Sequence, residues 1–349
     1  MRGAADRPFV SVVVPVWNEA RHVDACLRRL FEQTYPPGRV EIIVVDGLSD
    51  DGTREHVERL IAEGAGGGAD APALHLVDDS KRQRPSAVNT GIRAARGSVI
   101  ARIDARALVP RDYLARCVDA LERTGADNVG GIQKPIATAP MQEAIGLAMS
   151  HPFGVGNAQF RLGRRSGFVD SVYLGCFRRE VFDRVGLFDE DAPLLSEDSD
   201  INQRIREAGG RVYLDTAIVV GYYPRETLGA LWKLYFRYGG ARAGNLLKHG
   251  NLTSWRQAVP PALVAALVVL GALSFVSRWS LAAFGTLLGA YVVCDLVAAG
   301  AAASAAGRPG LWARVAAVFP CIHVAWGSGV LVRLWRRRGA ESLWTWTER

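Results

Sequence analysis

The sequence has 349 residues, a formal net charge of +7 and 49% hydrophobic residues. This length allows a soluble domain of about 225 residues followed by a membrane region, and the basic excess suits an anionic membrane surface or phosphate-bearing ligands. Charge alone would allow nucleic-acid binding, but no recognised motif supports it, so we expect none. The five cysteines include no C-x-x-C pair, which argues against a disulfide or zinc framework and favours a reducing compartment.

The first predicted elements form a βαβ unit. Residues 9–16 are a continuous apolar run, typical of a strand buried on both faces of a parallel sheet. A helix is predicted over residues 21–33, and a second strand, V-E-I-I-V-V-D, follows it. Ligands of open α/β sheets bind beyond the carboxyl ends of the strands. We therefore expect the loops over residues 15–19 and 46–53 to border one crevice.

The same pattern continues with a strand at L-H-L-V-D-D, a helix over residues 87–96 and a strand, S-V-I-A-R-I-D-A-R, that ends on Asp104. An Asp at the carboxyl end of a strand is well placed for a divalent cation or a sugar hydroxyl, although a single Asp there is more often a turn former. Farther on, the S-E-D-S-D cluster over residues 196–200 precedes a helix-like run. Its acids either do chemistry or hold a cation, or they cap the helix and complement its dipole.

Four of these motifs together resemble a known family. They are V-S-V-V-V-P-V-W-N-E, V-V-D-G-L-S-D-D-G-T, S-A-V-N-T-G-I-R-A-A-R-G ahead of I-D-A-R, and S-E-D-S-D. In order and spacing, across roughly residues 8–225, they are similar to glycosyltransferase family 2 enzymes of the GT-A fold. The narrower likeness is to membrane-attached glucosyltransferases of succinoglycan-type exopolysaccharide assembly. The resemblance implies an α/β fold, in which a GT-A (Rossmann-like) nucleotide-sugar-binding domain precedes C-terminal transmembrane helices.

The resemblance also implies a donor site. Its residues would surround the nucleotide base and ribose: Pro15, Trp17, Asn18 and Glu19, with Asp46 contacting the uracil or ribose. Trp17 could equally be a packing residue at the end of its strand. Gly47 stands where many family members carry a second Asp that reads the base, so the base specificity stays open.

The catalytic residues follow from the resemblance as well. Asp104 matches the first acid of the D-x-D motif, which ligates a divalent metal (Mn²⁺ or Mg²⁺) that bridges the donor diphosphate. Asp198, beside Glu197, matches the general base, which takes the proton of the acceptor hydroxyl opposite the leaving nucleoside diphosphate. Arg106 stands at the second acid of D-x-D and cannot ligate a metal. Either it supplies positive charge near the diphosphate, or it points to solvent or pairs with a nearby acid.

The second half of the chain changes in composition. Residues 133–140 and 151–161 are rich in Pro and Gly and predict a long active-site loop. Residues 228–247 predict an amphipathic helix at a membrane interface, with an ordinary surface helix as the alternative. Residues 258–277, 279–306 and 311–332 are each apolar enough to cross a bilayer of roughly 30 Å.

The expected domains are therefore residues 1–225 (GT-A domain), 226–257 (interfacial helix), 258–332 (membrane region) and 333–349 (basic tail). No secretory signal precedes the first strand, so we expect a multi-pass protein of the inner or plasma membrane with a cytoplasmic catalytic domain. Three crossings would then place Arg333 and Arg336–Arg338 on the far side, against the positive-inside tendency. Either the first stretch, which contains Pro260 and Pro261, is re-entrant, or the second does not cross simply.

The expected function is inverting transfer of a sugar from a nucleotide-sugar, a UDP-sugar, to a membrane-associated acceptor such as a polyprenyl-linked glycan in exopolysaccharide or cell-envelope glycan synthesis. F-R-Y-G-G-A-R occupies the region where processive synthases carry Q-x-x-R-W, which predicts addition of one or a few sugars. Glycan-assembly partners would fit the membrane setting. Two alternatives remain: a non-catalytic membrane scaffold, and a sugar-phosphate nucleotidyltransferase. The nucleotidyltransferase should show a Gly-rich loop where this chain has W-N-E.

Overall fold

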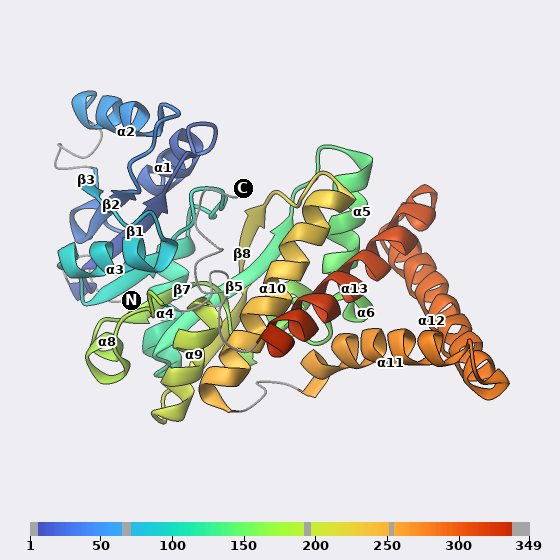
Figure 1. Ribbon diagram of the computed structural model, residues 1–349. Helices are drawn as coiled ribbons and strands as arrows, with labels where there is room; N and C mark the ends of the chain where they lie inside the picture. Colours follow the sequence, from blue (N-terminus) through green and yellow to red (C-terminus); the bar gives the residue numbers. More distant parts are fainter. Residues whose placement is uncertain (1–5, 65–70, 192–196, 251–254, 337–349) are drawn as a thin grey trace. The chain divides into compact units, whose positions relative to one another are not determined.

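The computed structural model describes residues 6–64, 71–191, 197–250 and 255–336. These residues form two compact units, shown along the chain in Figure 1. The first unit comprises the described parts of residues 1–134 and 163–222, and the second those of residues 135–162 and 223–341. Ser196, the first residue of the predicted acidic cluster, lies outside the described residues.

In the described part of the first unit, a mixed eight-stranded sheet forms the centre. This sheet confirms the predicted α/β class. Its strand order is β3-β2-β1-β4-β7-β5-β8-β6. The strands are β1 (Val10–Val16), β2 (Val40–Asp46), β3 (Ala73–Asp78), β4 (Val99–Arg102), β5 (Asn128–Pro135), β6 (Gly167–Phe168), β7 (Tyr173–Arg178) and β8 (Val212–Tyr222).

The first four strands run parallel and belong to the βαβ units expected from the sequence. β1 pairs with β2 and β4, and β2 pairs with β3, all in parallel. Every residue of β1 and β2 is buried, as a continuous run of β-branched residues requires of strands covered on both faces. The carboxyl ends of these strands consequently lie at one edge of the sheet, where the loops after β1, β2 and β4 begin.

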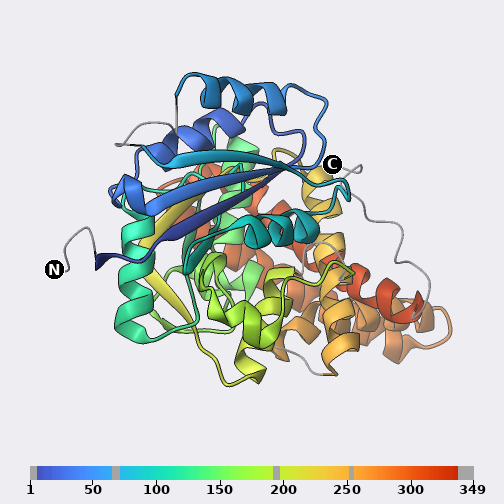
Figure 2. The same ribbon diagram turned by 90° about the vertical axis from the view of Figure 1, so that its left-hand side faces the viewer.

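Helices cover both faces of this parallel half. Figures 1 and 2 show α1 (Val23–Phe31) and α2 (Thr53–Ala62) on one face and α3 (Arg84–Ala94) on the other. This follows from right-handed crossovers, because the chain moves outward from β1 to β3 and then returns past β1 to β4. α3 approaches the sheet closely at Gly91, where a Cβ atom would lie 2.3 Å from Val13 Cγ1.

The second half of the sheet is mostly antiparallel and brings distant segments back to β4. β7 pairs antiparallel with both β4 and β5, and β6 pairs antiparallel with β8. The remaining helical segments of this unit are η2 (Pro37–Arg39), α4 (Tyr113–Thr124), α8 (Glu180–Val185) and α9 (Glu197–Glu207). α9 carries the described acids of the S-E-D-S-D cluster in its first turn.

The second unit is helical throughout its described elements. They are α5 (Pro140–Met149), α6 (Pro152–Val155), α7 (Gln159–Leu162), α10 (Leu228–His249), η3 (Trp255–Ala258), α11 (Val259–Leu273), α12 (Arg278–Ala305), η4 (Pro309–Leu311) and α13 (Trp312–Arg336). The prediction of a loop over residues 151–161 was wrong, since α6 and α7 occupy it. Pro152 stands in the first turn of α6, where a proline starts a helix rather than breaking one.

Among the described residues, three helices of this unit are long and apolar enough to cross a membrane. They confirm the three predicted hydrophobic segments. The spans are Arg256–Leu273, Arg278–Ala305 and Pro309–Arg336. They indicate that the chain associates with a membrane. The predicted helix over residues 228–247 is also observed, as α10.

Candidate active site

The loops after β1 and β2 are held together by side chains at the carboxyl edge of the sheet. Asn18, which adopts a left-handed backbone conformation (φ 53°), donates through Nδ2 to Asp50 Oδ1 at 2.9 Å. The Asp50 N–H in turn donates to Asn18 Oδ1 at 3.0 Å. The Glu19 N–H donates to Thr53 Oγ1 at 2.8 Å. The two loops thus form one surface, as the strand pattern predicts.

Asp46 ends β2 and is fully buried. Its carboxylate accepts hydrogen bonds from Ser49, from Oγ at 2.6 Å and from the backbone N–H at 3.2 Å. Arg54 Nη1 lies 3.7 Å from its second oxygen. Asp46 therefore fixes the loop that follows β2. Of the other expected donor residues, Pro15 is buried within β1 and Trp17 is half-buried just beyond it.

Arg106 forms an ion pair with Glu19, which links the segment after β4 to the loop after β1. Its Nε lies 2.8 Å from Glu19 Oε2 and 3.0 Å from Oε1. Glu19 is 6% exposed, so the carboxylate side of this ion pair is largely shielded from solvent. Pairing with a nearby acid was one of the two roles considered for Arg106. Here the arginine joins two of the loops that border the predicted crevice.

A buried guanidinium lies beneath the acids that the sequence singles out. Arg102, the last residue of β4, is 1% exposed. It donates through Nη2 to Asp104 Oδ1 at 2.9 Å and lies 3.5 Å from Glu197 Oε1. Its Nη1 donates to Asp198. One cation therefore brings together the three acids that match the metal ligand, the general base and its neighbour.

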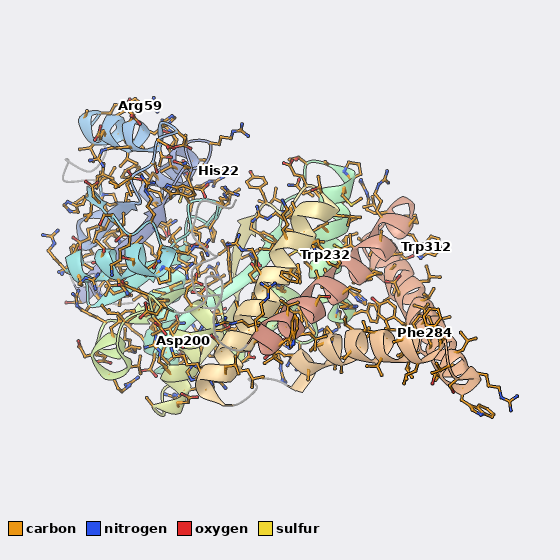
Figure 3. The ribbon with its side chains drawn as sticks, viewed as in Figure 1. His22, Arg59, Asp200, Trp232, Phe284 and Trp312 are labelled. Atoms are coloured by element: carbon orange, nitrogen blue, oxygen red, sulfur yellow. The ribbon has the colours of Figure 1, made fainter. Side chains whose placement is uncertain are left out.

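Arg84 also contacts this group, and Asp200 secures the helix that carries two of its acids. Arg84, at the start of α3, places Nη1 3.2 Å from Glu197 Oε1. Asp200, labelled in Figure 3, is fully buried and accepts from Arg204 Nε at 2.8 Å, one turn along α9. Arg204 also donates to the backbone carbonyl of Leu187 at 2.9 Å. Asp200 thus secures α9, and only Glu197 and Asp198 of the described cluster contact Arg102.

The pKa values of Glu197 and Asp198 are shifted in opposite directions. Burial would raise the pKa of Glu197, but Arg84 and Arg102 outweigh it and the pKa is lowered. Burial raises the pKa of Asp198 to about 7; Arg102 opposes the rise, and Glu197 and Asp104 add to it. Glu197 is therefore a fixed anion, whereas Asp198 has a pKa suited to proton transfer near neutral pH. The side chain of Asp198 is 35% exposed, which leaves it open to a substrate.

The sequence reasoning missed Arg102 and Arg84. For Arg102 a signal was present, because an arginine stands inside a strand that was predicted from an apolar run. A charge in such a place needs an ionic partner, and the nearest acids beyond that strand were already candidates. Arg84 carries no comparable signal, since it stands in a polar segment before a helix.

The donor atoms present suit a metal ion held jointly with a substrate. Among the described residues no group of three or more His, Cys, Asp or Glu side chains is arranged to hold a metal by itself. Asp104 offers a single carboxylate just beyond the carboxyl end of β4, with its side chain 27% exposed. Mg²⁺ and similar cations often bind through one or two carboxylates plus substrate phosphates. Asp104 could supply the one protein carboxylate of such a site, with Arg102 orienting it.

Comparisons with known proteins agree with this fold. The model named Glycosyl transferase family 2 matches residues 11–186, and the model named Glycosyl transferase family group 2 matches residues 99–298. With an α/β sheet that carries acids at its carboxyl edge, these matches make the chain a glycosyltransferase. It belongs to glycosyltransferase family 2.

Two curated relatives and one solved structure are similar over most of the chain. Succinoglycan biosynthesis protein ExoA of Rhizobium meliloti is 32% identical over 77% of this chain and 78% of its own length. A dolichyl N-acetyl-alpha-D-glucosaminyl phosphate 3-beta-D-2,3-diacetamido-2,3-dideoxy-beta-D-glucuronosyltransferase of Methanococcus voltae is 26% identical over 69% of this chain and 75% of its own length. The mannosyltransferase PcManGT of Pyrobaculum calidifontis, solved with GDP-Man and Mn²⁺, shares the fold with a TM-score of 0.67 at 23% identity, over 97% of this chain and 90% of that one.

Proposed function

We propose that this enzyme transfers a sugar, with inversion, from a nucleotide-sugar to an acceptor carried on a polyprenyl or similar lipid phosphate. The observation that carries the proposal is the Arg102 group, in which Asp104 and Asp198 meet at the carboxyl edge of the sheet. The apolar helices of the second unit support a lipid-borne acceptor. So do the names of relatives, one a dolichyl-phosphate-linked sugar transferase and another an undecaprenyl-phosphate 4-deoxy-4-formamido-L-arabinose transferase.

The reaction needs a base on the acceptor side. Asp198 takes the proton of the acceptor hydroxyl as that oxygen attacks the anomeric carbon, and the nucleoside diphosphate leaves from the opposite face. A pKa of about 7 lets Asp198 accept a proton and later release it near neutral pH. Glu197 remains ionised between Arg84 and Arg102 and holds the first turn of α9 in place.

The leaving group needs positive charge on the donor side. Asp104 would hold a divalent cation jointly with the diphosphate oxygens, and this cation would stabilise the negative charge of the leaving group. Asp46, Asn18, Pro15 and Trp17 lie in or next to the joined β1 and β2 loops, where the base and ribose of a UDP-sugar would bind. The Arg106–Glu19 pair fixes the position of the first loop.

The biological setting follows from the same features. The enzyme would work at the inner or plasma membrane, with the catalytic unit in the cytoplasm where nucleotide-sugars are made. Its product would be a lipid-linked glycan extended by one or a few sugars, within exopolysaccharide or cell-envelope glycan synthesis. The similarity to succinoglycan biosynthesis protein ExoA supports the exopolysaccharide assignment.

The test is donor turnover by the detergent-purified protein. UDP- and GDP-sugars are screened with a bacterial lipid extract, with and without manganese, and both the released nucleotide and the glycosylated lipid are measured. We expect release of UDP that depends on the lipid extract and a product lipid larger by one or a few sugars. Release of a nucleoside monophosphate, or formation of a long polymer from one donor, would contradict the proposal.

A further inference from the structure

The three apolar helices differ in how much of their surface the protein covers. In the most apolar 18-residue stretch of each span, only 11% of the residues are buried in α11 and in α12, against 44% in α13. A helix that is hydrophobic on all sides is either a membrane span or the core helix of a domain. The first description fits α11 and α12, which expose large side chains such as Val268 and Val297 along their length. The second fits α13.

α13 packs on α10, α11, α12 and α5. It packs most extensively on α10, and the two backbones come close where glycines face each other. A Cβ atom on Gly239 would lie 2.1 Å from the carbonyl oxygen of Trp326, and one on Gly329 would lie 2.0 Å from that of Phe236. Arg237 and Arg242 lie within three residues of Gly239 on α10. If this part of α13 lay in hydrocarbon, α10 would carry those charges into it as well.

α13 also receives polar contacts from the short helices that precede α10 in the chain. The His323 ring, on α13, is hydrogen-bonded through Nε2 to the backbone carbonyl of Phe153 in α6, at 2.7 Å. The Phe153 and Phe319 rings pack edge to face at 5.0 Å between centroids. α6 has four residues, far too few to cross a bilayer. These contacts hold the middle of α13 against α6.

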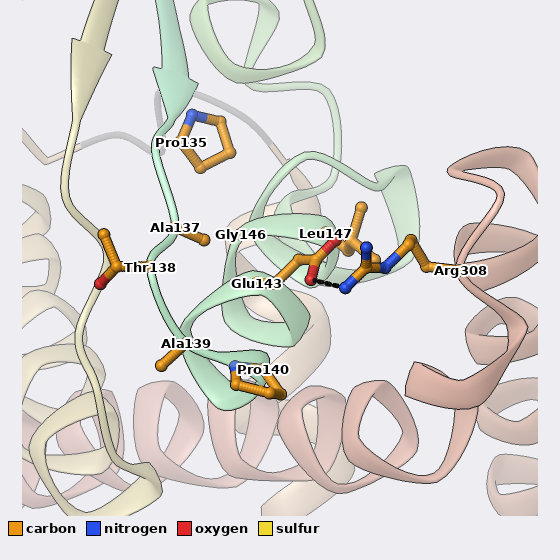
Figure 4. A pocket seen from close by; sticks show the side chains of 9 residues that line it. All are labelled: Pro135, Ala137, Thr138, Ala139, Pro140, Glu143, Gly146, Leu147 and Arg308. Atoms are coloured by element: carbon orange, nitrogen blue, oxygen red, sulfur yellow. Dashed lines mark hydrogen bonds and ion pairs between the residues drawn. The ribbon is translucent and has the colours of Figure 1, made fainter.

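Both ends of the α11–α12 hairpin return to α13. At the entrance, Gly327 packs against the backbone of Pro260, where a Cβ atom would meet the carbonyl oxygen at 2.6 Å. In the last third of α12, the Leu296 carbonyl accepts a hydrogen bond from Trp312 Nε1 of α13 at 3.0 Å. The loop after α12 also pairs with α5, because Arg308 Nη2 donates to Glu143 Oε2 at 2.8 Å. Figure 4 shows this pair at the wall of a cavity of about 500 Å³.

The turn of the hairpin has the composition of a membrane–water interface. Phe275, Val276 and Trp279 are between 74% and 90% exposed, and Arg278 lies over the Trp279 ring at 5.4 Å from its centroid. Trp and Arg are typical of the ends of transmembrane helices, and an arginine at the tip of a hairpin that stopped within the hydrocarbon would be costly. The 18-residue first span is about 27 Å long and the 28-residue second about 42 Å, so both can reach across.

We propose that only α11 and α12 cross the membrane, as a hairpin whose turn at residues 274–278 reaches the far side, and that α13 lies on the near side together with α10. The apolar composition of α13 then reflects burial in protein and not contact with lipid. Two crossings return the chain to the side on which it entered, so Arg333 and Arg336 stay with the catalytic unit. This arrangement satisfies the positive-inside tendency that three crossings violate. It goes beyond the proposed reaction and does not depend on the donor or acceptor.

The test is site-directed cysteine labelling in the full-length protein. In a background with Cys294→Ala and Cys321→Ala, single cysteines replace Val276 at the turn, Trp335 near the end of α13, and Glu55 on the exposed side of α2 as the reference for the catalytic unit. Intact spheroplasts and inverted vesicles are treated with a membrane-impermeant maleimide. Labelling in SDS confirms that each thiol reacts, and a melting temperature in detergent equal to that of the parent protein confirms that each variant is folded.

We expect Val276→Cys to react only from outside, and Trp335→Cys to react only in inverted vesicles, as Glu55→Cys does. Labelling of Trp335→Cys from outside would show a third crossing and overturn the inference. Labelling of Val276→Cys from the inside only, or in SDS only, would show a re-entrant hairpin and would overturn it too. Loss of transferase activity in the wild type would leave this result intact, so the two proposals fail separately.

Discussion

The guanidinium of Arg102 donates to the carboxylate of Asp104, two residues farther along the same strand end, at 2.9 Å. The same guanidinium contacts Glu197 and Asp198 at the start of α9. It therefore links the segment proposed to hold the donor diphosphate to the segment proposed to activate the acceptor. A single buried cation sets the spacing between the two halves of the site.

Replacing Arg102 should be costly for both stability and activity. Arg102→Met would leave three neighbouring carboxylates without their shared cation, and we expect a loss of about 3 to 5 kcal/mol of unfolding free energy. Arg102→Lys keeps a charge but cannot reach all three acids, so it should fold and yet lose most turnover. Thermal unfolding and nucleotide release in detergent measure both effects. Arg123→Met, which removes an exposed pair with Asp215, is the matched control and should cost no more than about 1 kcal/mol. If Arg102→Met were as stable as Arg123→Met, the role given to Arg102 would be contradicted.

The Arg106–Glu19 pair should behave as an energetic unit. We expect Arg106→Met to destabilise the protein because Glu19, 6% exposed, would lose this ion pair. Glu19→Gln in the same chain should restore part of that loss, with a coupling of about 0.5 to 3 kcal/mol in a double-mutant cycle. The cycle is measured by thermal unfolding, with KM for the donor as a second readout. Strictly additive effects would show that the pair does not hold the loop.

Stability in acid should depend on Glu41. Burial would raise the pKa of this carboxylate, but hydrogen bonds from Ser11 Oγ at 2.5 Å and from Arg96, through its backbone N–H at 2.7 Å, outweigh burial and lower it. A lowered pKa stabilises the fold above the unfolded-state value of about 4.5, and this contribution is lost as the pH falls through the folded-state pKa.

We therefore expect Glu41→Gln to cost about 1 to 3 kcal/mol at pH 7 and progressively less below about pH 4.5. Melting temperatures of the wild type and the variant, compared across that range, measure the narrowing gap. A gap that stays constant or widens in acid would mean that the pKa of Glu41 is not lowered in the folded protein.

The glycines that join α10 and α13 should not tolerate a methyl group. Gly329→Ala places a Cβ atom against the backbone of Phe236, and we expect a loss of about 1 to 3 kcal/mol from overpacking. Gly289→Ala on α12 is the matched control, because a Cβ atom there meets nothing within 4 Å. Thermal unfolding in detergent compares the two. A Gly289→Ala variant as unstable as Gly329→Ala would argue against close packing of α10 on α13.

The parallel half of the sheet could be predicted because its strands are continuous apolar runs that end at polar turns. Local pattern is enough there, and β1, β2 and β4 fall within the predicted ranges. The partners of Arg102 could not be predicted in the same way, since Asp198 stands 96 residues away in sequence. Only the folded sheet brings them together.

The second unit shows where composition misleads. Pro and Gly over residues 151–161 suggested a loop, yet Pro152 begins a helix and Gly154 is buried against Phe319. Composition alone also cannot separate a core helix from a membrane span, because both are apolar all round. What distinguishes α13 from α12 is the set of neighbours that each contacts, and these come from distant parts of the chain.

The measurement that most directly tests Asp198 as the general base is donor turnover by Asp198→Asn with its lipid acceptor. The wild type and the exposed control Asp119→Asn are measured beside it. We expect Asp198→Asn to lose roughly 100-fold or more in turnover, the size of a general-base contribution, while it still binds the donor and keeps its melting temperature. Asp119→Asn, which removes only a surface partner of Arg7, should match the wild type. Full turnover by Asp198→Asn would show that the proton leaves by another route and would contradict the mechanism.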